Sequence, residues 1–247
     1  MIEAVSNPTL RVADVTGIAE LAAAHGALLV VDNTFTTPAM FRPMEHGADI
    51  VINSITKFLA GHSDVTLGYV AAREPGLRTA IYDAAVTWGT TPSPFDCWLA
   101  ERGLHTFDLR FEKAQATAAA LADALAGRDG IRQVIYPGRA DHPHHNRAGT
   151  LFGGQFGNML SFEIEGGRDE VNSFVMNAGG IPFAPTLGDV GCTLSHPASS
   201  SHRALTTEGR AALGISEGYF RLSVGIEPPE LVLAELDAAL AAVRGES

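Results

Sequence analysis

Residues 48–64 read ADIVINSITKFLAGHSD, and this stretch decides the fold. Its apolar part, 50–52, has the composition of a β-strand, and polar residues begin where the chain would leave a sheet. In open α/β sheets, ligands bind at the carboxyl ends of the strands. The stretch therefore predicts an α/β fold with Lys57 at the mouth of a site.

Lys57 stands between small hydroxyl residues and a turn that contains glycine. A lysine can form a Schiff base when its amine, with an ordinary pKa of about 10.4, is held deprotonated. Ser54 and Thr56 are two residues apart, so in extended backbone their hydroxyls would share one face and could hold a phosphate. The alternative is a surface lysine that merely follows a strand.

A second strand, 27–32, is apolar on both faces and is therefore predicted to be central and parallel. It ends at Asp32, whose carboxylate could pair with a protonated pyridine nitrogen. Taken alone, Asp32 is better explained as a cap of the following turn. With Ser54, Thr56 and Lys57 one crossover away, the two strand ends together predict a site for pyridoxal 5′-phosphate (PLP).

The composition limits the classes of protein to consider. The chain has 247 residues, 46% of them hydrophobic, which is enough for one large or two small domains. Its net charge of −11 disfavours nucleic acid and anionic membranes as partners. Only Cys97 and Cys192 occur, and no signal peptide or membrane-spanning run is recognisable, so a cytoplasmic location is expected.

The first half, 1–108, is predicted to be a PLP-binding large domain with a mostly parallel sheet. Helical spacing over 14–24 precedes the strands 27–32, 49–54 and 66–72. A strand as apolar as 28–31 requires neighbours on both sides, because an open apolar edge promotes aggregation. We therefore expect this domain to be incomplete at its N-terminal side, or to be completed by another chain.

The second half, 109–247, is predicted to be a smaller α+β domain. It begins with an alanine-rich helix over 109–126 that ends at Gly127. The following patterns favour strands at 131–135, 158–164 and 219–225, and helices near 168–177, 206–213 and 229–244.

Arg221 is the candidate for binding a substrate carboxylate. On a two-residue period, Arg221 and Ser223 face opposite to Phe220, Leu222 and Val224. An arginine on an apolar strand suits bidentate capture of a carboxylate, and Thr186 could add a hydroxyl. The alternative for Arg221 is an ion pair on a half-exposed sheet.

The cluster Asp141-His142-Pro143-His144-His145 does not have the spacing of a metal site. It lacks an i, i+4 pair on one helix face, and no cysteine or second carboxylate stands close in sequence. A polar loop that caps the following segment is the better interpretation. His196 and His202, in a turn-rich stretch, receive the same interpretation, and no metal is predicted.

Jointly, these residues resemble the Cys/Met-metabolism (transsulfuration) class of PLP-dependent enzymes, which includes cystathionine γ-lyase, methionine γ-lyase, cystathionine γ-synthase and O-acetylhomoserine sulfhydrylase. The matching pieces are Glu3 with Ser6-Asn7-Pro8, Val31-Asp32-Asn33-Thr34-Phe35, Ser54-Ile55-Thr56-Lys57 with Gly61-His62-Ser63-Asp64, Arg102-Gly103-Leu104, Tyr136-Pro137-Gly138, His196-Pro197-Ala198-Ser199 with Ser201-His202, and 212–225. They run from end to end of the chain in the order of the family. The resemblance implies a PLP-dependent transferase of fold type I.

The resemblance also implies roles. Lys57 would carry PLP and shuttle protons, Asp32 would hold the pyridine nitrogen, and Asn7 would lie near the 3-oxygen of the cofactor. Ser54 and Thr56 would hold part of the phosphate. Arg221 and Thr186 would bind the α-carboxylate of a small amino-acid substrate.

Within the family, Pro185 and the turn 187–189 are more similar to the lyase version, which implies γ-elimination on a sulfur amino acid. The alternatives are γ-replacement, as in cystathionine γ-synthase or O-acylhomoserine sulfhydrylase, and a non-catalytic fragment. The family's glycine-rich phosphate turn and ring-stacking tyrosine have no counterpart in this sequence, so a complementing N-terminal segment is expected. The resemblance also implies a homo-oligomer, a dimer of dimers.

Overall fold

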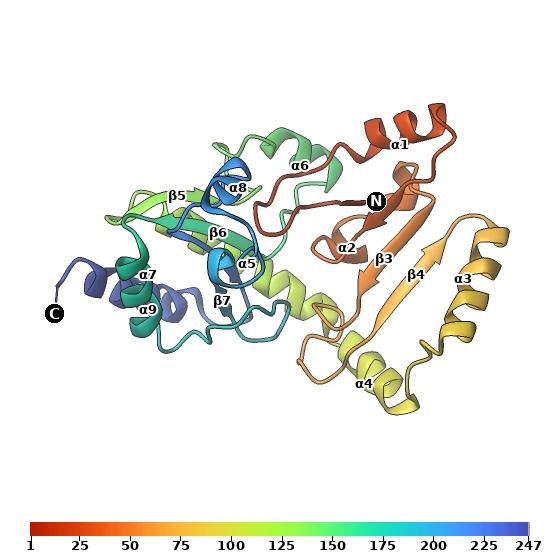
Figure 1. Ribbon diagram of the computed structural model, residues 1–247. Coiled ribbons are helices and arrows are strands. Elements are labelled where there is room, and N and C mark those ends of the chain that lie inside the picture. Colours follow the sequence, from red (N-terminus) through yellow and green to blue (C-terminus); the bar gives the residue numbers. More distant parts are fainter. Residues whose placement is uncertain (247) are drawn as a thin grey trace.

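The computed structural model describes residues 1–246, and its strands form two sheets that lie on either side of the long helix α5 (Figure 1). The first sheet has the strand order β1-β2-β3-β4. Its strands are β1 (Ile2–Glu3), β2 (Val30–Asp32), β3 (Ile50–Ser54) and β4 (Gly68–Ala72). β1, β2 and β3 are parallel, and β4 is antiparallel to β3. The prediction that β2 is central and parallel is confirmed, whereas the short strand β1 was not predicted.

Helices follow and separate these strands. They are α1 (Val15–Ala24), α2 (Thr37–Met40), the 3₁₀ helix η1 (Pro43–His46), α3 (Pro75–Trp88) and α4 (Pro94–Leu104). α1 begins where Asp14 accepts a hydrogen bond from the backbone N–H of Gly17 at 3.2 Å, as expected of an N-cap. The predicted helix over 14–24 is therefore confirmed.

α5 (Phe107–Leu125) connects the two halves of the chain. Its first turns place Phe107 and Phe111 in the hydrophobic cluster under the first sheet. Further along, Leu121 and Leu125 lie in the cluster of the second sheet. The predicted helix over 109–126 is present and begins two residues earlier. The division between 108 and 109 thus falls inside this helix, and the two-domain description stays a prediction.

The second sheet is antiparallel throughout, in the order β5-β6-β8-β7. Its strands are β5 (Ile131–Ile135), β6 (Met159–Ile164), β7 (Thr193–Ser195) and β8 (Tyr219–Ser223). The remaining helices are α6 (His145–Leu151), α7 (Arg168–Asn177), η2 (Pro197–Ser199), α8 (Thr207–Ala212) and α9 (Pro229–Val243). The three predicted strands and three predicted helices are confirmed, whereas β7 and α6 were not predicted.

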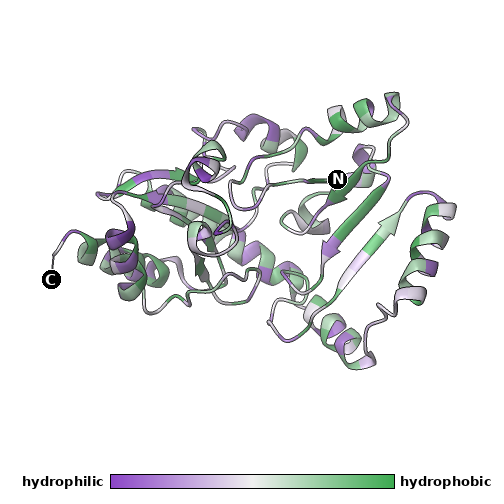
Figure 2. Ribbon diagram, viewed as in Figure 1, coloured by the Kyte–Doolittle hydropathy of each residue, from purple (hydrophilic) through white to green (hydrophobic). Residues whose placement is uncertain are grey.

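Apolar side chains remain uncovered on α3 and α4. α3 buries none of its residues, and Trp88 is 80% exposed. Figure 2 shows green, hydrophobic stretches along α3. The exposed apolar side chains of these two helices are Tyr82, Val86, Trp88, Phe95, Trp98 and Leu104. We call them the α3–α4 apolar surface. Within residues 1–246, no helix combines the length and the apolarity needed to cross a membrane.

Candidate active site

The carboxyl ends of β1, β2 and β3 meet at one edge of the first sheet. Because the three strands are parallel, this edge receives Asn7, Asp32, Ser54 and Lys57 from the segments that end or follow them. The ends of β2 and β3 are tied together, since Thr34 Oγ1 accepts the Ser54 N–H at 3.0 Å. The sheet therefore gathers four of the predicted site residues along one edge.

Asp32 caps the turn after β2, as its alternative interpretation predicts. Its Oδ1 accepts the Thr34 N–H at 2.9 Å, while Oδ2 makes no hydrogen bond within residues 1–246. Glu3 lies near the Asp32 carboxylate. Burial is the main cause that raises the pKa of Glu3, and the negative charge of Asp32 raises it further. Asp32 thus retains a free carboxylate oxygen at the edge of the sheet.

Ser54 and Thr56 differ in their environment. β3 ends at Ser54 and residues 55–60 form a turn, so the expectation that the two hydroxyls share one face of extended backbone is wrong. Thr56 Oγ1 donates to Leu67 O at 3.1 Å and accepts the Leu67 N–H at 2.9 Å. The Ser54 hydroxyl has no hydrogen bond among residues 1–246. Of the two, only Ser54 has a hydroxyl proton free for a ligand.

Lys57 lies half-buried in that turn, against Gly188. A Cβ on Gly188 would lie 2.9 Å from Lys57 Cα, and Gly188 has a φ of +85°, so both space and backbone favour glycine there. Burial lowers the pKa of Lys57, and the positive charge of Arg221 lowers it further. Both effects favour the neutral amine, the form that attacks a carbonyl carbon.

Arg221 is a buried guanidinium on β8, with 3% of the residue exposed. Its Nη1 donates to Asn7 Oδ1 at 2.9 Å, and its Nη2 donates to Thr186 O at 2.8 Å and Pro185 O at 3.3 Å. Its Nε has no partner. No carboxylate lies within ion-pair distance in the described part of the chain, so the ion-pair alternative is wrong.

The guanidinium of Arg221 therefore has no carboxylate partner among residues 1–246. Burial lowers its pKa to about 10. A buried cation without an anionic partner is costly, and an anion bound beside it would offset that cost. Thr186 reaches Arg221 through its carbonyl oxygen, while its hydroxyl makes no hydrogen bond among residues 1–246. The Arg221 site is therefore suited to a carboxylate.

β8 contributes one whole face to this site. Tyr219 OH donates to Pro8 O at 2.9 Å, and Ser223 Oγ accepts the Gly188 N–H at 2.9 Å. The predicted alternation is confirmed, because the opposite face lies in the core cluster, with Phe220, Leu222 and Val224. Tyr219 was not predicted as a site residue, although it shares the two-residue period of Arg221.

His142 and His144 bond to the N-terminal segment and to each other, whereas His202 lines the same pocket as Asn7. His144 Nδ1 accepts the Val12 N–H at 3.0 Å, and His142 Nδ1 accepts the His144 N–H at 3.1 Å. The 141–145 loop thus joins the N-terminal segment to α6. No group of three potential metal ligands is assembled within residues 1–246.

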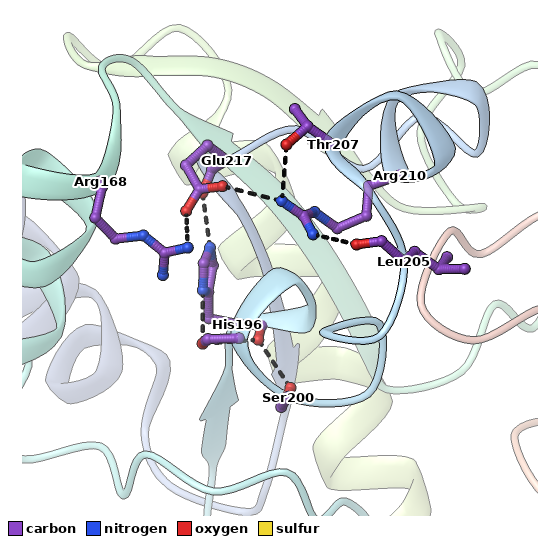
Figure 3. Close-up of polar contacts among 8 residues, drawn as sticks. Arg168, His196, Ser200, Leu205, Thr207, Arg210 and Glu217 are labelled. Carbon is purple, nitrogen blue, oxygen red and sulfur yellow. Dashed lines mark hydrogen bonds and ion pairs between the residues drawn. The ribbon is translucent and has the colours of Figure 1, made fainter.

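His196 supports a separate polar cluster, shown in Figure 3. Its Nε2 bonds to Glu217 O at 2.7 Å and its Nδ1 to Ser199 Oγ at 2.8 Å, and only 1% of the residue is exposed. The Glu217 carboxylate pairs with Arg168 and Arg210. These contacts anchor the loops before β8, so His196 has a structural role.

The lowered pKa of Lys57 predicts that the stability difference between wild type and a variant without this lysine depends on pH. The folded protein binds fewer protons at Lys57 than the unfolded chain does, so the free energy of unfolding should rise as pH approaches the ordinary lysine value. Lys57→Met removes the charge, and its gain in stability over wild type should be larger near pH 7 than near about pH 10.5. Urea midpoints at both pH values measure this. The matched control is Lys113→Met on the exposed side of α5, and a pH-independent gain for Lys57→Met would contradict the prediction.

Comparisons with known proteins find similarity over almost the whole chain. A cystathionine beta-lyase of Bacillus subtilis is 41% identical over 239 residues, covering 97% of this chain and 61% of that protein. A cystathionine gamma-lyase of Dictyostelium discoideum is 40% identical, covering 97% and 62%. The solved structure of a cystathionine gamma synthase from Xanthomonas oryzae pv. oryzae, in complex with cystathionine, has a TM-score of 0.94 and 45% identity, covering 100% of this chain and 63% of that one.

These similarities identify the family and the fold. The chain spans about 61% of the length of the curated relatives it matches. The structural matches confirm the predicted α/β architecture of PLP-dependent fold type I. A family model described as Cys/Met metabolism PLP-dependent enzyme matches residues 1–241. With this match over nearly its full length, the chain belongs to the Cys/Met metabolism family of PLP-dependent enzymes.

Proposed function

We propose that this chain carries the catalytic lysine of a PLP-dependent carbon–sulfur lyase, which acts by γ-elimination on a sulfur amino acid such as cystathionine or methionine. The observation that carries the proposal is that Lys57 lies near Arg221. The first is an amine with a lowered pKa, and the second is a buried guanidinium with an unpartnered Nε and no carboxylate. An amine near enough to a buried guanidinium to feel its charge suits a carbonyl cofactor and an amino-acid carboxylate.

The residues at the sheet edge fit PLP chemically. A free carboxylate oxygen on Asp32 suits a protonated ring nitrogen, and the free hydroxyl of Ser54 suits a phosphate. Asn7 uses Oδ1 to accept from Arg221, which leaves its Nδ2 without a hydrogen bond among residues 1–246 and available to the 3-oxygen of the ring. When bound, PLP supplies an electron sink for the substrate carbons next to the amino group.

Each residue would then have one task. Lys57 would hold the cofactor and afterwards move protons along the substrate, Arg221 would orient the α-carboxylate, and Thr186 would line the same place. Thr56 would have a structural role. Its hydroxyl proton is donated to Leu67 O, and this bond closes the turn that carries Lys57. A small-molecule amino acid is thus the proposed substrate class.

The choice of γ-elimination rests on Pro185 and the turn 187–189, which are more similar to the lyase version of this loop. The 45% identity to a cystathionine gamma synthase favours γ-replacement as the second candidate. A non-catalytic protein is the third candidate, since the family's glycine-rich phosphate turn and ring-stacking tyrosine have no counterpart in this sequence.

The proposed enzyme works as a homo-oligomer, a dimer of dimers, in which a second copy or a complementing N-terminal segment covers exposed apolar surface. The α3–α4 apolar surface supports this, because exposed apolar areas of that kind commonly mark protein contacts. A cytoplasmic location is also part of the proposal, and the low cysteine count supports it.

Product analysis tests the reaction. The chain is incubated with PLP and L-cystathionine, or with O-succinylhomoserine and L-cysteine. γ-Elimination of cystathionine releases cysteine, 2-oxobutyrate and ammonia, whereas γ-replacement joins O-succinylhomoserine and cysteine into cystathionine with loss of succinate. We expect the first set of products. Cystathionine formation would instead support the second candidate, and no product together with no PLP absorbance would support the third.

A further inference from the structure

The turn that carries Lys57 presents a row of backbone carbonyls to α5. The turn is helix-like, since the Ala60 N–H bonds to Ile55 O and the Gly61 N–H bonds to Lys57 O, at 2.9 and 2.8 Å. The carbonyls of Phe58, Leu59 and Ala60 follow Lys57 directly. The last carbonyls of such a turn lack partners within it and attract a cation.

Arg110 supplies that cation from the first part of α5. Its Nη1 donates to Phe58 O at 2.9 Å, and its Nη2 lies 3.1 Å from Leu59 O and 3.4 Å from Ala60 O. One planar guanidinium therefore bridges three consecutive carbonyls of the turn. The flat, five-donor geometry of arginine makes this possible, and a lysine ammonium cannot reproduce it.

The guanidinium of Arg110 is itself held in place. Its Nε donates to Thr106 Oγ1 at 3.0 Å, and its Nη2 donates to Gly103 O at 2.8 Å. Gly61, with a φ of +73°, lies directly against Nη1, and a Cβ at that position would overlap the guanidinium. A rigid helix, a fixed side chain and a close backbone contact thus define where the turn can lie.

The loop that also serves Arg221 supports the same turn. The Val190 N–H donates to Gly61 O at 2.8 Å, and Ser63 Oγ donates to Asp189 Oδ2 at 2.6 Å. Gly188, in the same loop, lies so close to the turn that an added Cβ would be 2.9 Å from Lys57 Cα. The Lys57 turn is therefore held both by Arg110 on α5 and by the 186–190 loop.

We propose that Arg110 is a positioning residue for the reaction, whose guanidinium fixes the 58–60 carbonyls and thereby holds Lys57 at the sheet edge beside Arg221. This inference rests on the proposed function of Lys57 as the reactive amine. Arg110 touches neither substrate nor cofactor in this role, and it acts through the turn. Its loss should let the Lys57 side chain move into solvent.

The test follows Lys57 directly, without PLP. Lys57 and Lys113 are the only lysines in the chain, so reductive ¹³C-dimethylation gives two lysine NMR signals beside that of the N-terminus. We compare wild type with Arg110→Ala, Arg110→Lys and the matched control Arg139→Ala, whose guanidinium bonds to Ala122 O, Asp123 and Asp141. Lys57→Ala assigns the signal. Amide hydrogen exchange of Lys57, Ala60 and Gly61 is measured on unlabelled protein.

We expect the titration midpoint of Lys57 to rise in Arg110→Ala and in Arg110→Lys, and the turn amides to exchange roughly 10- to 100-fold faster. Arg139→Ala should leave both readouts at wild-type values. Arg110→Lys keeps the charge, so a change in that variant reports the lost bridging geometry, and it carries the test if Arg110→Ala does not fold. A wild-type Lys57 midpoint and wild-type turn exchange in Arg110→Lys would overturn the proposal.

The outcome is separate from that of the proposed function. If Lys57 responds to Arg110 as expected but PLP never attaches to it, the positioning role stands and the proposed function fails. If PLP attaches to Lys57 while Arg110→Lys leaves the Lys57 readouts unchanged, the positioning role fails and the proposed function stands.

Discussion

Lys57→Ala should abolish covalent capture of PLP and lower turnover by at least about 10⁴-fold, because the covalent nucleophile and the proton carrier are lost together. Lys57 is the half-buried amine with a lowered pKa at the sheet edge. The measurement is borohydride reduction in the presence of PLP, followed by mass spectrometry of the peptides. Wild type should carry one pyridoxyl group on the peptide that contains Lys57.

The matched control is Lys113→Ala, since Lys113 is the other lysine of the chain and lies exposed on α5. That variant should retain the adduct and the visible absorbance. Attachment of PLP to Lys113 in wild type, or an adduct of equal yield in Lys57→Ala, would show that the sheet-edge amine is not the reactive one.

Arg221 variants should lose substrate binding and keep the cofactor. A charge-assisted contact to the substrate carboxylate corresponds to roughly a 10- to 100-fold rise in KM when it is removed. We expect this rise in Arg221→Ala and a smaller one in Arg221→Lys, with a smaller effect on kcat. Borohydride-fixed PLP should persist in both variants. Steady-state kinetics with cystathionine, together with the yield of adduct, measure the two effects.

Arg221 also has structural contacts, and a control must account for them. Its removal leaves Asn7 Oδ1 without its donor and Thr186 O with only the 3.3 Å bond from Thr193 Oγ1, which should lower stability by about 1–3 kcal/mol. Arg244→Ala, which breaks an exposed pair with Glu246, serves as the control for the loss of one arginine. Equal loss of PLP adduct in Arg221→Ala and Lys57→Ala would contradict the assigned roles.

Much of the fold could be predicted from local pattern. The apolar runs of β2 and β3, the alanine-rich α5 and the alternation on β8 each carry a period that specifies an element. β1 and β7 could not be found this way. They have two and three residues, and pairing with neighbouring strands creates them rather than their own composition.

Only those site residues could be predicted whose type and position at the end of a predicted strand point to a function. Lys57, Asp32 and Ser54 follow strands, so their shared edge could be inferred. The turn geometry that commits the Thr56 hydroxyl to Leu67 could not, because it depends on contacts eleven residues apart. Arg110 was missed for the same reason, since its partners lie about fifty residues away in the sequence.

α5 has a consequence for recombination between family members. At 19 residues it is about 28 Å long, and its two ends serve different cores. A chimera with its junction inside this helix would combine the Arg110 of one parent with the C-terminal packing of the other. Exchanges of sequence that take both 55–61 and 94–126 from a single parent should therefore transfer the lysine turn together with its support from Arg110.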